Sequence, residues 1–182
     1  MRLFVSVDVG SLAEDIRSVQ APLRGLEGLR RTDPEQAHAT VKFLGEGEHD
    51  LDALGDALER AVTEASVGPF DVSLGDVGAF PSEEYIRVVW LGFRDGIEQL
   101  AELHRRVETR TTDLGYDAER HEFTPHVTLA RMDNAASKAA VRRFLRESDP
   151  DVGSVRIEVL RLKESTLTPD GPEYRTVRHF EL

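Results

Sequence analysis

Two short segments of the chain carry the same residue types at the same spacing. They are His38-Ala39-Thr40-Val41 and His126-Val127-Thr128-Leu129. Side chains alternate between the two faces of a β-strand, so the histidine and the threonine of each segment share one face. The apolar residues between and after them point to the other face, where they can pack. Each segment therefore presents one imidazole and one hydroxyl together.

Two imidazoles that face one another suit the chemistry of phosphodiesters. Near about pH 6 to 7 one ring can be protonated and donate a proton while the other is neutral and accepts one. Two threonine hydroxyls can donate hydrogen bonds to the non-bridging oxygens of a phosphate, and an imidazolium opposes the negative charge that develops there. This chemistry requires neither a metal nor a cofactor, and we expect none.

A single His-x-Thr segment is common by chance, and such a histidine is more often a structural residue on a polar strand face. Two copies at equivalent points of an internal repeat are much harder to explain by chance. We therefore interpret the pair as functional.

The elements that must position these segments repeat along the chain. Apolar spacing predicts a strand, a helix, a strand, a helix and a strand in each half. The predicted strands cover residues 2–9, 38–44, 70–77, 85–93, 125–130 and 155–162, and a last strand covers 174–182. We expect one domain over residues 1–182, with repeat halves at about 1–80 and 84–165.

The predicted fold class is α+β. Mixed strands and helices without a dinucleotide-type glycine loop favour two pseudo-symmetric antiparallel halves, with helices outside and a groove between the sheets. We expect the chemistry in that groove.

Composition limits the function further. The chain has 23 basic and 34 acidic residues, a net charge of −11, which argues against wrapping long nucleic acid and leaves recognition of an RNA end. The absence of cysteine excludes thiolate chemistry. The first apolar run is too short for a signal peptide or a membrane span, so we expect a cytoplasmic protein without a membrane partner, and a monomer. The acidic, lysine-poor balance suggests adaptation to high salt.

The chain resembles the two-histidine phosphoesterase superfamily, and is most similar to its RNA 2′,3′-cyclic phosphodiesterases, also called 2′-5′ RNA ligases. The resemblance runs end to end. Besides the paired HXTX segments, it is carried by residues 1–8, 42–45, 80–81, 85–90, 125, 130–131 and 162–174.

The resemblance implies hydrolysis of a terminal 2′,3′-cyclic phosphate on RNA to a 2′-phosphate. It makes His38 the proton donor and His126 the proton acceptor, with Thr40 and Thr128 on the phosphate. One departure is that residues 31–37 lack the bulky apolar residue that often precedes the first histidine.

Further residues are candidates on local grounds. Lys42 is expected on the same face as His38, where it would reach phosphate or sugar. Arg131 matches an arginine of the family pattern, but strand alternation places it out of phase with His126 unless the strand bulges near Ala130.

Other side chains have weaker functional interpretations. Asp8 and Glu122 are candidates to orient an imidazole. Four aromatic residues are candidates for stacking on a base, although most aromatics in such a domain are core: Phe43, Phe80, Tyr85 and Tyr174. The remaining histidines lack the spacing of zinc ligands: His49, His104, His121 and His179.

Three alternatives to this function stay open. The chain is a related enzyme for cyclic nucleotides or 2′-5′ oligonucleotides, it also catalyses 2′-5′ ligation of RNA ends, or it is a non-catalytic RNA-end binding module. A substrate panel separates the enzymes, and product formation separates them from the binding module.

Overall fold

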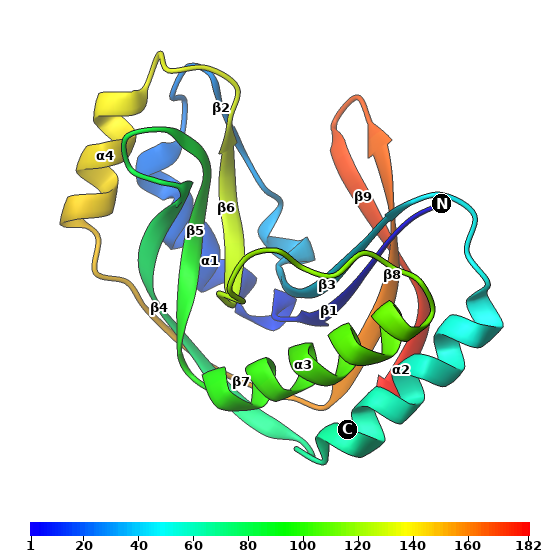
Figure 1. The fold of residues 1–182 in the computed structure, drawn as a ribbon. Helices are drawn as coiled ribbons and strands as arrows, with labels where there is room; N and C mark the ends of the chain where they lie inside the picture. Colours follow the sequence, from blue (N-terminus) through cyan, green and yellow to red (C-terminus); the bar gives the residue numbers. More distant parts are fainter.

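The computed structural model describes all 182 residues as one curved antiparallel sheet with four outer helices (Figure 1). The strands run in the order β7-β4-β5-β6-β3-β1-β8-β9, and the short β2 also pairs with β6. Their bounds are β1 (Arg2–Asp8), β2 (Leu29–Arg31), β3 (His38–Glu46), β4 (Phe70–Pro81), β5 (Ile86–Asp95), β6 (His126–Met132), β7 (Asp151–Ile157), β8 (Val159–Thr168) and β9 (Gly171–Glu181).

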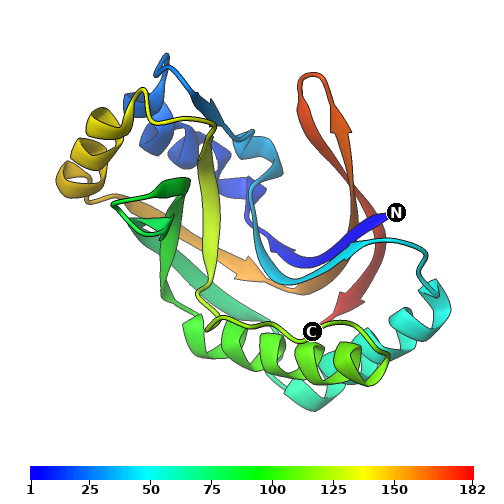
Figure 2. The ribbon, with the colours of Figure 1, turned by 45° about the horizontal axis from the view of Figure 1, so that its top comes forward.

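The helices cover the outer side of this sheet. They are α1 (Ala13–Gln20), α2 (Leu51–Ala65), α3 (Ile97–Asp113) and α4 (Lys138–Glu147). Helices α1 and α4 lie against β7 and β4, whereas α2 and α3 pack on one another and against β9 and β3 (Figure 2). None of the helices is both long and apolar enough to cross a membrane.

Local sequence explains where α2 begins and which face it buries. The Asp50 carboxylate accepts hydrogen bonds from the backbone N–H groups of Asp52 and Ala53, which otherwise lack partners in the first helical turn. Leu54 and Leu58, four residues apart on one face, are fully buried. The helix is thereby fixed against the sheet.

The expected α+β class with antiparallel halves and outer helices is confirmed, but the repeat halves are not the lobes. Strand β4 of the first repeat pairs with β5 and β7, and strand β8 of the second pairs with β1 and β9. One lobe therefore consists of β1, β3, β8 and β9, and the other of β4, β5, β6 and β7. The two lobes are joined into one sheet through β3 and β6.

Candidate active site

Strands β3 and β6 bring the two His-x-Thr segments side by side. Ala39 of β3 pairs with Val127 of β6, and these are the residues between the histidine and the threonine of each segment. Continuing this antiparallel register by one residue places His38 beside Thr128, and Thr40 beside His126. We call the side of the sheet that carries these four residues the histidine face. Ala39 and Val127 point away from it and are buried beneath the helices.

Both imidazoles are held in the same way. The Nδ1 atom of His38 lies 2.9 Å from the carbonyl oxygen of Gln36, and Nδ1 of His126 lies 2.8 Å from that of Thr124. A carbonyl oxygen only accepts, so each Nδ1 carries the proton and donates it. Neither Nε2 atom has a partner within the protein, which leaves both available for proton transfer. The hydroxyls of Thr40 and Thr128 are likewise unpaired.

Burial lowers the pKa of both histidines. For His38, the charges of Lys163 and His126 lower the pKa further, while the Gln36 carbonyl and the Asp8 carboxylate oppose the shift. For His126, Arg131 adds to the effect of burial, and the Thr124 carbonyl opposes it. Each imidazole can therefore stay neutral, and act as a base, at a pH below the usual pKa of histidine.

Aromatic rings fix the planes of both imidazoles. The ring of His38 lies 5.0 Å from Tyr174, edge to face, and 5.0 Å from Phe4. The ring of His126 lies 4.9 Å from Phe80, also edge to face, and 6.2 Å from Trp90. Such edge-to-face packing favours one orientation of each ring.

A bulge in β6 places Arg131 on the histidine face. Trp90 pairs with Thr128 and Val89 with Ala130, so Leu129 has no partner on β5. One extra residue reverses the alternation from this point on. The strand thus bulges near Ala130, as the sequence required for Arg131 to share the face of His126. The charge of Arg131 acts to lower the pKa of both His126 and Tyr174.

A known protein family and several relatives match almost the whole chain. A family model described as the 2′-5′ RNA ligase superfamily matches residues 9–164. The chain belongs to this superfamily. An RNA 2′,3′-cyclic phosphodiesterase of Archaeoglobus fulgidus is 37% identical over 185 residues, covering 100% of both chains. One of Methanocaldococcus jannaschii is 32% identical over 182 residues, covering 99% of this chain and 100% of the relative.

Solved structures support the same fold for this member of the 2′-5′ RNA ligase superfamily. A crystal structure of a Thermus thermophilus protein matches with a TM-score of 0.76 at 26% identity, over 100% of this chain and 98% of the other. The Escherichia coli LigT complexed with 3′-AMP gives a TM-score of 0.78 at 24% identity, over 100% and 97%. The latter likeness shows the fold alone.

The expectation that Lys42 lies on the same face as His38 in this superfamily member is wrong. Val5 pairs with Lys42 and Ser6 with Thr40, so β3 has an extra residue at Val41. The bulge turns Lys42 to the helix side, where its side chain is 2% exposed. Its ammonium group donates to the Glu108 carboxylate at 2.7 Å and to the Asp117 carbonyl at 2.6 Å. Lys42 is therefore not free to bind a phosphate.

An ionic cluster beside His38 was not predicted from the sequence. Asp8 is the cross-strand partner of His38 and forms ion pairs with Lys163 and with Arg161, the latter at 3.1 Å. The two cations are two residues apart on β8, so they share the histidine face. The sequence shows two basic residues at this spacing, but it does not show that β8 pairs with β1 and brings them to Asp8.

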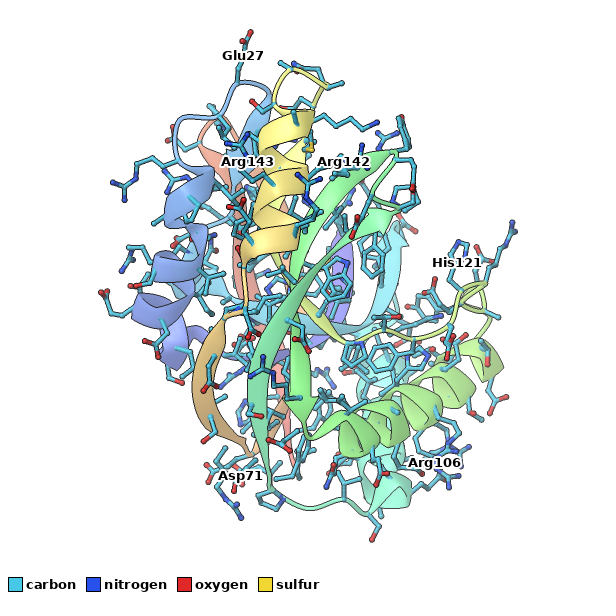
Figure 3. All side chains as sticks on the ribbon, turned by 90° about the vertical axis from the view of Figure 1, so that its left-hand side faces the viewer. Glu27, Asp71, Arg106, His121, Arg142 and Arg143 are labelled. Carbon is cyan, nitrogen blue, oxygen red and sulfur yellow. The ribbon has the colours of Figure 1, made fainter.

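Of the other histidines of this superfamily member, His104 and His121 line the pocket that also borders His126. His104 stacks on Phe123, and His49 stacks on Tyr116. His121 lies on the loop between α3 and β6, at the edge of the molecule (Figure 3), and His179 is exposed on β9. No three histidine or carboxylate side chains are grouped to hold a metal ion.

The weaker candidates of the sequence lie in different places. Phe80 contacts the imidazole of His126 and Tyr174 that of His38, whereas Tyr85 is 61% exposed beyond the end of β4. Phe43 is 45% exposed and lies under the Arg2 guanidinium, 4.9 Å from the ring centre. Glu122 lines a pocket beside His126.

Proposed function

We propose that this chain hydrolyses the 2′,3′-cyclic phosphate at an RNA end and releases a 2′-phosphate. The main support for this proposal is the pairing of β3 with β6, where two imidazoles with free Nε2 atoms and two free hydroxyls share one face. The names of the full-length relatives support the same reaction. General acid and base groups of this kind typically contribute about 10² to 10⁴ to the rate.

In the proposed mechanism, the Nε2 atom of His126 removes a proton from water as the water oxygen attacks phosphorus. The bond between phosphorus and O3′ breaks, and protonated His38 donates its Nε2 proton to O3′. One proton is taken and one is given, so the enzyme returns to its starting charge with the two protonation states exchanged. Thr40 and Thr128 donate to the non-bridging oxygens, and Arg131 offsets the negative charge of the phosphate.

The surroundings of the two histidines support this assignment of roles. The Asp8 carboxylate lies across the strand pair from His38 and favours its imidazolium form, which partly offsets the opposite effects of burial and Lys163. The equivalent neighbour of His126 is Gly92, which has no side chain, and Arg131 disfavours a charged ring there. His38 is thus better suited to donate, and His126 to accept.

We further propose that the protein recognises only the end of its RNA and works as a monomer in a cytoplasm of high salt. The net charge of −11 repels a long polyanion, and at about 1 M salt the screening length falls to about 3 Å, which removes most self-repulsion between surface carboxylates. Unfolding during dialysis into low salt supports adaptation to salt, and full stability there contradicts it.

The direct test is hydrolysis of a short RNA that ends in a 2′,3′-cyclic phosphate, in EDTA and at high salt. Phosphorus NMR identifies the product. A 2′-phosphate supports the mechanism, with departure of the 3′ oxygen, whereas a 3′-phosphate contradicts the proposed geometry. No turnover would contradict the enzymatic function and favour a binding module.

A further inference from the structure

The two lobes present different charges on the histidine face. The β5 residues that pair with β6 on this face are uncharged: Val88, Trp90 and Gly92. Arg94, further along β5, is surrounded by three carboxylates. In the other lobe, β8 presents Arg161 and Lys163 to the histidine face, and only β1 separates β8 from β3, which carries His38. Available positive charge on the strands that flank the two histidines therefore lies on the His38 side.

These two cations are not fully neutralised within the protein. The Asp8 carboxylate is the ion-pair partner of both, so the cluster of three side chains has a net charge of +1. Lys163 is 8% exposed and is held in place by this pair, whereas Arg161 is 34% exposed. Arg161 contacts Asp8 through Nε at 3.1 Å, and its two terminal nitrogens have no partner within the protein. An anchored guanidinium with free terminal nitrogens is suited to bind two oxygens of a phosphate.

The proposed reaction, on which this inference rests, places the RNA chain on the same side as these cations. His38 protonates O3′, so the ribose carbon C3′ lies on its side of phosphorus, while the water attacks from the side of His126. The 5′ arm of the ribose is attached to C4′, which is bonded to C3′. The phosphate that precedes the terminal nucleotide therefore lies beyond His38, over β1 and β8. Two strand spacings of about 4.8 Å place β8 about 10 Å from β3, and the long side chains of Arg161 and Lys163 shorten that distance.

We propose that Arg161 and Lys163 bind the phosphate on the 5′ side of the terminal nucleotide. The recognised RNA end is then the last nucleotide together with one preceding phosphodiester, so an oligonucleotide is preferred to a cyclic mononucleotide. One phosphodiester carries one negative charge, which matches the single excess positive charge of the cluster. Thr176, the exposed cross-strand neighbour of Lys163, adds a hydroxyl donor on the same face.

The test compares three substrates. The first is the dinucleotide adenylyl-(3′→5′)-adenosine with a 2′,3′-cyclic phosphate end, and the second is the same dinucleotide with an uncharged methylphosphonate at its internal linkage. The third is adenosine 2′,3′-cyclic phosphate. We expect kcat/KM for the first substrate to exceed that for the other two by about tenfold or more, the effect of one hydrogen-bonded charge pair. The methylphosphonate separates the charge of the phosphate from the contacts of the additional nucleoside.

Arg161→Gln removes the exposed cation and leaves Asp8 paired with Lys163. We expect the ratio of kcat/KM for the phosphodiester dinucleotide to that for its methylphosphonate form to fall about tenfold, to near one. Arg161→Lys keeps the charge without the planar fork and should restore part of the ratio. The matched control is Arg175→Gln on the neighbouring β9, because Arg175 pairs with Glu164 on the opposite face of the sheet. It should leave the ratio unchanged.

A binding measurement on the unmodified protein depends neither on turnover nor on the folding of a variant. Calorimetry compares the dinucleotide that ends in a 2′-phosphate with its methylphosphonate form. Weaker binding of the methylphosphonate form supports the subsite. Equal affinity of the two forms, or an unchanged kcat/KM ratio in Arg161→Gln, overturns the subsite alone. Failure to hydrolyse any cyclic phosphate, with the difference in affinity intact, overturns the proposed function and not the subsite.

Discussion

Strands β3 and β6 share their burial pattern over their first six residues, and each has an unpaired residue at its fourth position, Val41 in β3 and Leu129 in β6. Both histidines begin their strands, and both donate through Nδ1 to a carbonyl two residues upstream. The backbone of the site is therefore duplicated almost residue for residue. Its symmetry would make the two imidazoles equivalent if the surrounding side chains were also duplicated.

The surrounding side chains are not duplicated. Asp8 is the neighbour of His38, and Gly92 is the neighbour of His126. Two residues beyond each bulge, β3 presents Phe43 to the histidine face and β6 presents Arg131. The repeated backbone thus sets the geometry of the two imidazoles, whereas the residues that break the repeat give them different surroundings. In the proposed mechanism, these surroundings distinguish the acid side from the base side.

The largest expected effect comes from removing either imidazole. We expect His38→Ala and His126→Ala each to lower kcat roughly 10³-fold, because each removes one proton-transfer group. The double variant should be little worse than either single variant, since the two groups act in one step. Rates on cyclic-phosphate-ended RNA in EDTA, with circular dichroism to check the fold, test this. Full activity of either single variant would show that its histidine is not catalytic.

The two hydroxyls should be equivalent where the two histidines are not. Thr40→Val and Thr128→Val keep the side-chain volume, and each removes one donor to the phosphate, so we expect kcat to fall about 100-fold in each. Steady-state kinetics of both variants checks the prediction. A large loss in one variant and none in the other would mean that only one hydroxyl contacts the phosphate.

Lys42 and Ala130 occupy equivalent positions after the two bulges, but only Lys42 carries a charge that needs a buried partner. Removing this charge should therefore affect stability. Lys42→Met removes the ion-pair partner of the largely buried Glu108 carboxylate and leaves it only the backbone N–H of Glu119, which should lower the free energy of unfolding by about 2 kcal/mol. Urea denaturation measures this. The control is Lys138→Met, whose ammonium group contacts one backbone carbonyl only and whose loss should cost less. Unchanged stability of Lys42→Met with a raised KM would restore the substrate-binding role expected from the sequence.

The smallest effect should come from making the two histidine environments more alike. The Asp8 carboxylate raises the pKa of His38, against the lowering by burial, Lys163 and His126. Asp8→Asn removes this support, so the pKa of His38 should fall. In the proposed mechanism, activity requires protonated His38 and is lost as the pH rises through its pKa, so the alkaline limb of the kcat/KM profile should move to lower pH. Asp133→Asn, which breaks an exposed ion pair with Arg30, is the control and should not shift it.

Residue type and spacing alone predicted the four central residues, because a two-residue period survives in any strand. The same period predicted the wrong face for Lys42. It predicted Arg131 on the histidine face only if the strand bulges near Ala130. A bulge depends on pairing with a neighbouring strand and leaves no mark in the local pattern. The exchange of β4 and β8 between the repeats was also not predictable, since both read as ordinary strands. Lys163 and Arg161 were missed for the same reason, because their approach to Asp8 depends on that exchange.

The placement of β1 between β3 and β8 also constrains how the chain folds during synthesis. The segment Leu3–Val7, which is almost fully buried in the finished sheet, gains its partner β3 early, but its other edge waits for β8, more than 150 residues later. An apolar strand with a free edge can pair with other chains. Such distant pairing also makes closure of the sheet slow, on the order of milliseconds to seconds. The nascent protein therefore exposes one edge of this apolar strand until nearly all of its residues have been made.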